Sequence, residues 1–381
     1  MYTVLSTFAQ KGSGHIGDKL IEDSMERLIN LEKGEQEYFV LFRENDLEEH
    51  LDRINRSKAV LLPAMAIRDN PVYPFAYRLV DDLSRIKVPI IPLGANYNVY
   101  PGDRETRKTL RFSKETEDFL RYVSKQTDDF SCREYHTARL LKKHGVENTV
   151  MTGDPTWYDP DCFGKAFKRP NTIEKIVFSP PMSPFYLGQA KTTIKMMAAL
   201  FPKAEKYCAM QVADSSSAET EVGEDFLAEK SAALSPEAAE KNRKIRAFAK
   251  ENGFQVKELS HDIKRIDFLS ECDLHVGYEC HVHLYCYRKR IPSVLITEDA
   301  RGVGFSYTLG TGGFAGPLRA QRSLAKPLIK TVTSGYATEI EEYSLAPADM
   351  DLHESIADFL EEELESGFRR YIGMGALLDD A

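Results

Sequence analysis

Three kinds of feature are scarce in this sequence, and each scarcity excludes a class of protein. No apolar run approaches the about 18 residues that a membrane-spanning helix needs. The first residues, MYTVLSTFAQKGSG, lack the basic region and apolar core of a signal peptide. Positive charge is also scarce, because 50 Lys and Arg face 59 Asp and Glu, for a net charge of −9. Contacts to phosphates need a basic surface, so we expect no nucleic-acid partner.

Cysteine is the third scarce feature. The six cysteines stand at positions 132, 162, 208, 272, 280 and 286, without the spacing of a disulfide framework. We therefore expect reduced thiols and a cytoplasmic location. Cys208, Cys272 and Cys286 are expected to be core residues, since cysteine is among the most buried residue types.

What the sequence has in quantity is an alternation of short apolar runs and amphipathic stretches, which predicts α/β structure with parallel sheets. The length of 381 residues favours more than one domain. A stretch rich in Pro, Gly and Asp near residue 165 divides the alternating series in two. We expect two Rossmann-like domains facing a cleft, residues 1–165 and 166–345, with an amphipathic helix in residues 346–381 that packs back on them.

The segment from Asp273 to Phe305, DLHVGYECHVHLYCYRKRIPSVLITEDARGVGF, gathers histidine and arginine around short strands. A metal site is one interpretation, but the potential ligands are spread over a helix end, a strand and the next helix. Structural zinc sites instead use paired ligands on tight loops. We therefore predict no metal and no cofactor. A histidine packed in the core remains the plainest alternative for any one position.

An anion site needs only local geometry here. If DLHVG is a strand and HVHLYCYRKR a helix, His281 and His283 lie in the first helical turn, where unpaired backbone N–H groups favour a negative ligand. Arg301 follows the next strand, SVLIT, and would lie at the same sheet edge. The sequence thus predicts a phosphate or carboxylate held by this helix, His281 and Arg301.

Three segments together resemble the polysaccharide pyruvyl transferase family. His281, followed by Pro292 and SVLITEDARG, is similar to the C-terminal signature of that family. GHIGDKLI resembles its N-terminal motif at Gly17 and Asp18. SCREYHTARLLKKHGVENTVMTGDPTW resembles its Arg-Glu helix and Asp-Pro turn, through Arg133, Glu134, Asp154 and Pro155. The matches follow in the family's order over nearly the whole chain.

The chain also departs from the family's pattern at three positions. His15 stands where the family commonly has Asn, Glu279 where the Arg of Arg-x-His is expected, and Arg301 where a Lys is expected. The loss of a cation at position 279 bears on how an anionic donor would be held, and His283 or Arg288 are candidates to compensate.

The resemblance implies a two-domain fold of the GT-B type. It also implies transfer of pyruvate from phosphoenolpyruvate to a sugar as a cyclic ketal, in the synthesis of cell-surface or extracellular polysaccharide. The acceptor would be a sugar or a lipid-linked oligosaccharide, which could bring the protein into peripheral contact with a membrane. We assign His281 as general acid and Asp18 as the group that orients or deprotonates the acceptor hydroxyl. The donor-binding candidates are Arg301, His283, Arg288 and Glu279, and the acceptor-binding candidates are His15, Gly17, Tyr97, Asn98 and Arg133.

Other interpretations stay open. Asp18 could simply cap a helix, Arg133 and Glu134 could form an ion pair, and Asp154-Pro155 could be a structural turn. A sugar-nucleotide glycosyltransferase of the same shape would need a ribose-binding carboxylate, for which Glu279 and Glu298 are candidates. A non-catalytic sugar-binding relative is a further alternative. A dinucleotide-binding dehydrogenase would rest on Gly12, Gly14 and Gly17 alone, which is a weak signal.

Overall fold

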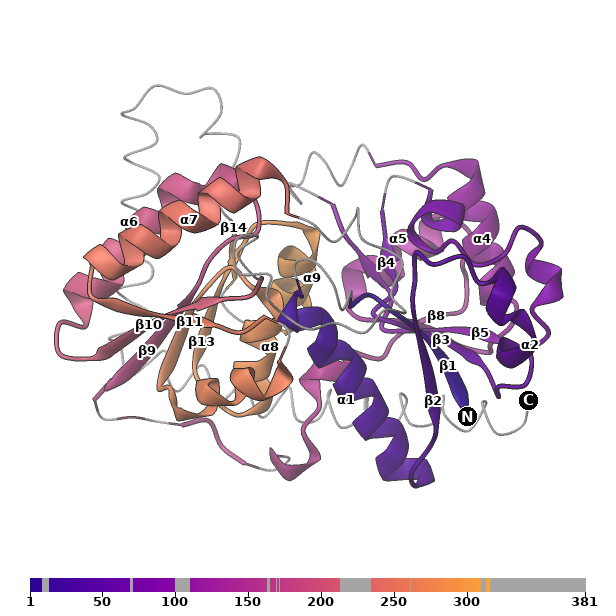
Figure 1. Ribbon diagram of the computed structural model, residues 1–381, viewed down its shortest axis with the longest axis horizontal. Helices are drawn as coiled ribbons and strands as arrows, with labels where there is room; N and C mark the ends of the chain where they lie inside the picture. The colour runs from indigo at the N-terminus through magenta and orange to yellow at the C-terminus, as the bar shows by residue number, and fades with distance from the viewer. Residues whose placement is uncertain are drawn as a thin grey trace.

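The N-terminal part of the chain forms a four-stranded parallel sheet in the order β2-β1-β3-β5 (Figure 1). The computed structural model describes residues 1–8, 14–68, 71–99, 110–162, 165–168, 170, 172–212, 234–260, 262–309 and 313–315. The strands of this sheet are β1 (Tyr2–Ser6), β2 (Tyr38–Phe42), β3 (Val60–Pro63) and β5 (Ile90–Leu93). Two short parallel pairs extend it, namely β4 (Ala66–Ile67) with β6 (Asn96–Tyr97), and β7 (Phe130–Cys132) with β8 (Thr149–Met151).

Helices cover both faces of this sheet, as expected for parallel strands, whose backbone polar groups and side chains are buried on both sides. Val60 and Leu62 of β3 are buried on one face and Leu61 on the other. The α-helices of this part are α1 (Ile16–Lys33), α2 (Leu51–Ile54), α4 (Lys114–Ser124) and α5 (Tyr135–Lys143). Short turns of other helix types are η1 (Glu48–His50), η2 (Val72–Ala76), η3 (Leu83–Arg85), η4 (Pro155–Trp157) and η5 (Pro160–Cys162).

The C-terminal part forms a six-stranded parallel sheet in the order β11-β10-β9-β12-β13-β14. Its strands are β9 (Lys175–Ser179), β10 (Glu205–Met210), β11 (Phe254–Glu258), β12 (Leu274–Gly277), β13 (Ser293–Thr297) and β14 (Gly313–Ala315). The helices are α6 (Leu187–Leu200), α7 (Pro236–Glu251), α8 (Cys280–Arg288) and α9 (Ala300–Leu309), with 3-10 turns η6 (Pro184–Tyr186) and η7 (Ile263–Glu271). α6 and α7 pack together on one face, whereas α8 and η7 lie on the other (Figure 1).

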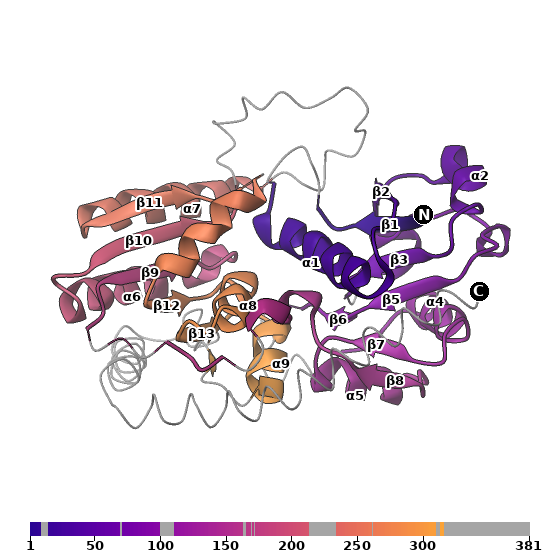
Figure 2. The same ribbon diagram turned by 90° about the horizontal axis from the view of Figure 1, so that it is seen from below.

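α1 joins the two units. Its N-terminal residues Ile16 and Leu20 pack with Val177 of the second sheet, while Met25 and Leu28, further along, pack with the first sheet. Figure 1 shows the helix running between the two sheets. α8 and α9 lie on the side of the second sheet that is turned toward the N-terminal unit (Figure 2), and α9 contacts α5. The two sheets therefore meet through α1, α8 and α9.

Most of the predicted elements are confirmed within one or two residues, and Ser113 and Ser235 cap α4 and α7 as serine commonly does. The spacing of Tyr77, Val80 and Leu83 in the sequence predicts a helix before β5. This prediction is wrong, because residues 77–82 are irregular and Tyr77 is a buried core residue. The domain boundary near residue 165 stays a prediction. The end of the second domain after residue 315 and the helix in residues 346–381 lie outside the described residues.

Two further expectations concern composition. All six cysteines are free, and Cys208, Cys272 and Cys286 are fully buried, as predicted for core residues. Among the helices that the structure describes, none combines the length and the apolarity needed to cross a bilayer.

Candidate active site

The site begins at the carboxyl end of β12, where the chain turns into α8. Gly277 packs so closely on Ser179 of β9 that a Cβ atom would collide with the Ser179 backbone. The Ser179 hydroxyl accepts the N–H of Glu279 at 3.1 Å. Glu279 is the extended residue that precedes α8, and His281 lies in the first helical turn. These constraints place both side chains at the edge of the sheet that faces α1.

The N-terminus of α1 closes the other side of this point. His15 caps the helix, its Nδ1 accepting the N–H of Gly17 at 3.1 Å. The N–H of Ile16 is donated to the carbonyl of Gln211, just after β10, at 3.1 Å, so α1 is tied to the second sheet. A Cβ atom on Gly17 would lie 2.7 Å from Cγ of His281 and 2.8 Å from Cε1 of His15. Only glycine lets the two rings approach the helix this closely.

Glu279 lies between the two imidazoles. Its Oε1 is 3.3 Å from Nδ1 of His281 and 3.6 Å from Nε2 of His15, and its side chain is 2% exposed. Burial alone would raise the pKa of Glu279, but the two histidines outweigh it and hold the pKa well below its ordinary value. For His15, burial would lower the pKa, whereas Glu279 and Asp18 raise it above the ordinary value, against the effect of Arg301. Glu279 is thus an ionised carboxylate in a buried place.

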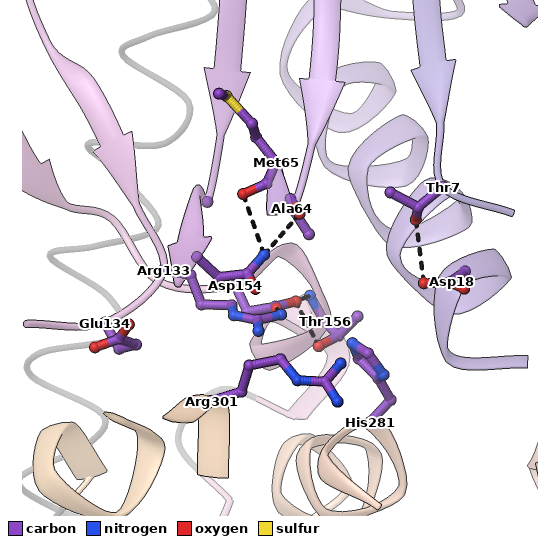
Figure 3. Close-up of polar contacts among 12 residues, drawn as sticks. Thr7, Asp18, Ala64, Met65, Arg133, Glu134, Asp154, Thr156, His281 and Arg301 are labelled. Atoms are coloured by element: carbon purple, nitrogen blue, oxygen red, sulfur yellow. Dashed lines mark hydrogen bonds and ion pairs between the residues drawn. The ribbon is translucent and has the colours of Figure 1, made fainter. Parts of the chain in front are cut away.

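Arg301 reaches the same place from α9. Asp299 caps this helix, and its carboxylate accepts from Nε and Nη2 of Arg301 at 2.7 and 2.5 Å. The N–H of Ala300 is donated to the carbonyl of Val99 at 3.0 Å, which brings the residues after β6 to the start of α9. Figure 3 shows the guanidinium of Arg301 turned toward the ring of His281. The Nε2 atom of His281 is buried and has no hydrogen-bond partner among the described residues.

A second arginine lies beside Arg301. Arg133 follows β7, is 1% exposed and donates from Nη1 to Asp154 at 3.0 Å. Its guanidinium carbon is 4.8 Å from the ring centre of Phe305, which lies one helical turn after Arg301 on the same face of α9. The Nε and Nη2 atoms of Arg133 are buried without a hydrogen-bond partner among the described residues. A fully buried cation with two unsatisfied donors is unusual, and this makes Arg133 a candidate to bind an anionic ligand.

For Asp154 and Glu134, two neighbours of Arg133, the structure gives contacts that differ from those considered from the sequence. Asp154 is both a turn residue and a partner of Arg133, since its Oδ1 accepts from Thr156 while its Oδ2 binds the arginine. Glu134 does not form an ion pair with Arg133 in the described contacts, but caps α5 through the N–H and hydroxyl of Thr137. Figure 3 shows Arg133 and Asp154 near His281 and Arg301.

Two of the predicted donor-binding residues, His283 and Arg288, lie away from His281. His283 points away from His281 into the core, where its Nδ1 bonds Ser293 at 2.7 Å and its ring contacts Tyr287. Arg288 lies at the far end of α8, where it donates to Ser24 of α1 at 3.0 Å. These positions contradict the donor-binding roles of both residues. His283 lies on nearly the opposite face of α8 from His281, and Arg288 lies two helical turns, about 10 Å, further along the helix.

Tyr97 and Asn98 differ from each other. Tyr97 is 2% exposed and belongs to the hydrophobic core of the first sheet, which contradicts its predicted role of stacking on a sugar. Asn98 is partly exposed and lies next to Val99 at the start of α9; its side-chain oxygen has no partner among the described residues. Asp18 is also partly exposed and accepts the hydroxyl of Thr7 at 3.1 Å (Figure 3). Asn98 and Asp18 remain acceptor-side candidates.

Sequence patterns missed two residues that shape the site. Asp299 stands two residues before Arg301 in EDARG, and an aspartate at that distance before a helical run is an N-cap signal that could have been recognised. Phe305, under the guanidinium of Arg133, carried no such signal, because one aromatic residue in a helix is usually core.

Among the residues that the structure describes, His15, Glu279 and His281 form a group that could hold a metal, since one ligand atom from each lies within 4.8 Å of the others. However, Nδ1 of His15 accepts a backbone N–H, which leaves the proton on Nε2, the atom that faces Glu279. A metal ligand needs a lone pair at that atom. The observed contacts therefore suit hydrogen bonding better than metal binding.

Comparison with known proteins identifies the class. The family model described as polysaccharide pyruvyl transferase matches residues 15–299. The chain belongs to this family and is a transferase. The match spans both sides of the site, from His15 to Asp299. A comparison with curated proteins finds no match.

Solved structures show the fold. The putative UDP-N-acetylglucosamine 2-epimerase from Listeria monocytogenes is 11% identical, with a TM-score of 0.50 over 93% of this chain and 90% of that one. UDP-GlcNAc 2-epimerase from Neisseria meningitidis, bound to UDP-GlcNAc, is 10% identical, with a TM-score of 0.49 over 98% of each chain. The first likeness, with the two parallel sheets, confirms the predicted GT-B-like class. At this identity it carries the fold and nothing about substrate.

Proposed function

We propose that the protein transfers pyruvate from phosphoenolpyruvate to two hydroxyl groups of a sugar, forming a cyclic ketal, in the cytoplasmic synthesis of a cell-surface or extracellular polysaccharide. The observation that carries this proposal is the convergence of His281, Arg301 and Arg133 from three separate segments. Arg301 and Arg133 are both close enough to act electrostatically on the thiol of Cys280, beside His281. Family membership supports the same activity.

The donor explains why two arginines are needed. Phosphoenolpyruvate carries a phosphate and a carboxylate, and guanidinium groups bind both with paired hydrogen bonds. Asp299 holds Arg301 in place, and Asp154 holds Arg133, so neither side chain must be ordered when the donor binds. The resemblance assigned Arg133 to the acceptor. Its position beside Arg301 instead supports a role at the second anionic group of the donor.

The chemistry then needs one acid and one base. With the donor bound, His281 carries a proton on both ring nitrogens, and the proton on Nε2 passes to the methylene carbon of the donor, which leaves positive charge at C2. A sugar hydroxyl attacks C2 and loses its proton to a base. The second hydroxyl then displaces the phosphate, which leaves with its bridging oxygen; the proton of this hydroxyl returns to His281, and the proton held by the base leaves with the phosphate. Two C–O bonds form, one C–O bond breaks, and the products are the ketal and inorganic phosphate. Asp18, in the first turn of α1, is the candidate base because its carboxylate is partly exposed. We propose a lipid-linked oligosaccharide as one form of the acceptor, which would bring the protein to the membrane surface.

The test is an assay of phosphate release from phosphoenolpyruvate with a panel of sugars and oligosaccharides, with products analysed by mass spectrometry. The expected product exceeds the acceptor by the mass of pyruvate less one water. Arg301→Ala should lower turnover by about 100-fold, because it removes a charge that stabilises the donor in the transition state. Arg243→Ala, on the exposed face of α7, is the matched control and should keep wild-type turnover. Turnover of UDP-sugars in place of phosphoenolpyruvate would contradict the proposal.

The side-chain contacts of the described residues do not support the alternative of a sugar-nucleotide glycosyltransferase. Both carboxylates suggested for a ribose are already engaged: Glu279 by two histidines, and Glu298 by the N–H groups of Met182 and Ser183 at 2.8 and 2.9 Å.

A further inference from the structure

Two of the positions at which this chain departs from the family's pattern are neighbours in space. His15 stands for the expected Asn and Glu279 for the expected Arg, near opposite ends of the matched segment. In the structure their side chains face each other, with His15 Nε2 3.6 Å from Glu279 Oε1. Two substitutions that look unrelated in sequence thus form one contact across the two units of the protein.

We propose that His15 and Glu279 act as one unit that positions His281, with Glu279 as the positioning residue and His15 as its anchor from the other domain. Glu279 Oε1 lies 3.3 Å from Nδ1 of His281, on the opposite side of the ring from Nε2. A carboxylate there keeps the proton on Nδ1 and fixes the plane of the ring. The role in turnover rests on the proposed function, whereas the positioning itself is a property of the free protein.

His15 is arranged to hold Glu279 rather than to act on a substrate. Its Nδ1 accepts the N–H of Gly17, so its remaining proton, on Nε2, is directed at Glu279. The start of α1 is in turn fixed to the second sheet by the Ile16–Gln211 hydrogen bond. Without these two histidines, an ionised carboxylate at 2% exposure would lose the side-chain contacts that it makes with the described residues, and a buried charge without such contacts is costly.

The positioning can be measured without any substrate. In protein labelled with ¹⁵N-histidine, long-range ¹H–¹⁵N spectra report which ring nitrogen carries the proton, and His281→Ala assigns the signal. We expect the Nδ1–H form of His281 in the wild type, a similar signal in Glu279→Gln, whose side-chain oxygen still accepts, and loss of that form in Glu279→Leu. An unchanged His281 signal in Glu279→Leu overturns the proposal. Shifts of the His15 and His281 signals on addition of one equivalent of Zn²⁺, reversed by EDTA, would also overturn it and assign the cluster to a metal.

The pairing is tested by exchanging both residues for those of the family's pattern. His15→Asn and Glu279→Arg should each lower kcat by about tenfold, with a smaller change in KM for phosphoenolpyruvate, because the position of His281 is disturbed. The double variant should recover to within about threefold of the wild type, since contacting residues are coupled. Losses that simply multiply in the double variant would show two independent roles and overturn the unit.

Circular dichroism checks that each variant folds. If one single variant does not fold, the Glu279→Gln spectra and the double variant still test whether His15 and Glu279 position His281. The two proposals also fail separately. Absence of phosphoenolpyruvate turnover in the wild type would refute the proposed function, while the histidine spectra would still decide whether Glu279 and His15 position His281.

Discussion

Two glutamates at the same edge of the second sheet are held in opposite states. Glu279 follows β12 and Glu298 follows β13, which are adjacent parallel strands, and the two side chains are 2% and 3% exposed. The pKa of Glu279 lies well below its ordinary value, whereas that of Glu298 is raised to about 8. Residue type, burial and position in the sheet are nearly the same, so the difference must come from the neighbours.

Burial raises the pKa of both groups, and only Glu279 has partners that reverse the effect. The two imidazoles beside Glu279 stabilise its charge. At Glu298 the adjacent Asp299 adds to the effect of burial, and the N–H groups of Ser183 and Met182 together with Lys241 only partly oppose them. The comparison shows how one sheet edge keeps an ionised carboxylate beside His281 and a protonated one a strand away. Each prediction below changes one side of this comparison.

The largest effect is expected from His281→Ala, which removes both the proposed acid and one partner of Glu279. Turnover of phosphoenolpyruvate should fall by about 100-fold or more, because proton transfer to the methylene carbon loses its donor. The measurement is kcat from phosphate release. His50→Ala is the control, since His50 lies in a surface turn of the first unit and should leave kcat unchanged. Full turnover in His281→Ala would remove this site from the mechanism.

The next largest effect is expected from Gly17→Ala, which disturbs the contact between His281 and Glu279 without changing any polar group. The new methyl group would overlap the ring of His281 and force it away from Glu279. We expect kcat to fall by about 10- to 100-fold, as small displacements of catalytic groups do, with a loss of about 1–3 kcal/mol in unfolding free energy from overpacking.

Gly188→Ala is the matched control for this change. Gly188 lies in the second position of α6, and its added Cβ would meet nothing within 4 Å. Alanine there should raise the unfolding free energy by about 0.5–1 kcal/mol, because glycine is a poor helix residue, and kcat should stay the same. Equal kcat values for the two alanine variants would show that contact with the His281 ring does not matter.

The sequence predicted the parts of this arrangement that are local. Alternating apolar runs predicted the strands and helices, and His281 and Arg301 were placed at one sheet edge because parallel strands end together. Gly17 and Asp18 were identified through the resemblance. The strands and helices could be predicted because each depends on a few neighbouring residues and on the order of elements along the chain, while the roles of Gly17 and Asp18 stay predictions.

What could not be predicted depends on contacts between distant segments. Nothing local to His15 or Glu279 indicates that their side chains meet, since the contact depends on how α1 crosses between the sheets. His283 was misplaced because a residue two positions from His281 lies on nearly the opposite side of a helix, so its contacts depend on packing against β13. Tyr97 was misplaced because a strand end can lie in a core as well as at a ligand site.

A moderate effect on turnover is expected from Asp18→Asn. This variant removes the carboxylate that lies near Nδ1 of His15, whereas Glu279 lies near Nε2. Asp18 Oδ2 is 3.8 Å from His15 Nδ1, so the two carboxylates flank one ring. Asparagine can keep the hydrogen bond from Thr7 but cannot take a proton from a sugar hydroxyl. We expect kcat/KM for the acceptor to fall by about tenfold while KM for phosphoenolpyruvate is unchanged. A defect confined to phosphoenolpyruvate binding would contradict the role of Asp18 on the acceptor side.

The smallest effect is expected on the other side of the comparison, from Glu298→Gln, and it concerns stability. Because the pKa of Glu298 is raised to about 8 in the folded protein, the folded state keeps a proton that the unfolded chain loses above its ordinary pKa near 4.5. This contribution to stability is complete below that ordinary value and is lost as the pH rises through about 8. Glutamine removes the dependence, so the melting temperature of the wild type relative to Glu298→Gln should fall by about 2 °C or more between pH 5 and 8.

The pH range of this comparison ends near 8, because Lys241, whose pKa burial lowers to about 8, begins to titrate there. Glu271→Gln, at an exposed carboxylate, should follow the wild type throughout. A constant difference between the wild type and Glu298→Gln would mean that Glu298 is ionised in the folded protein, and that the two glutamates are held in the same state after all.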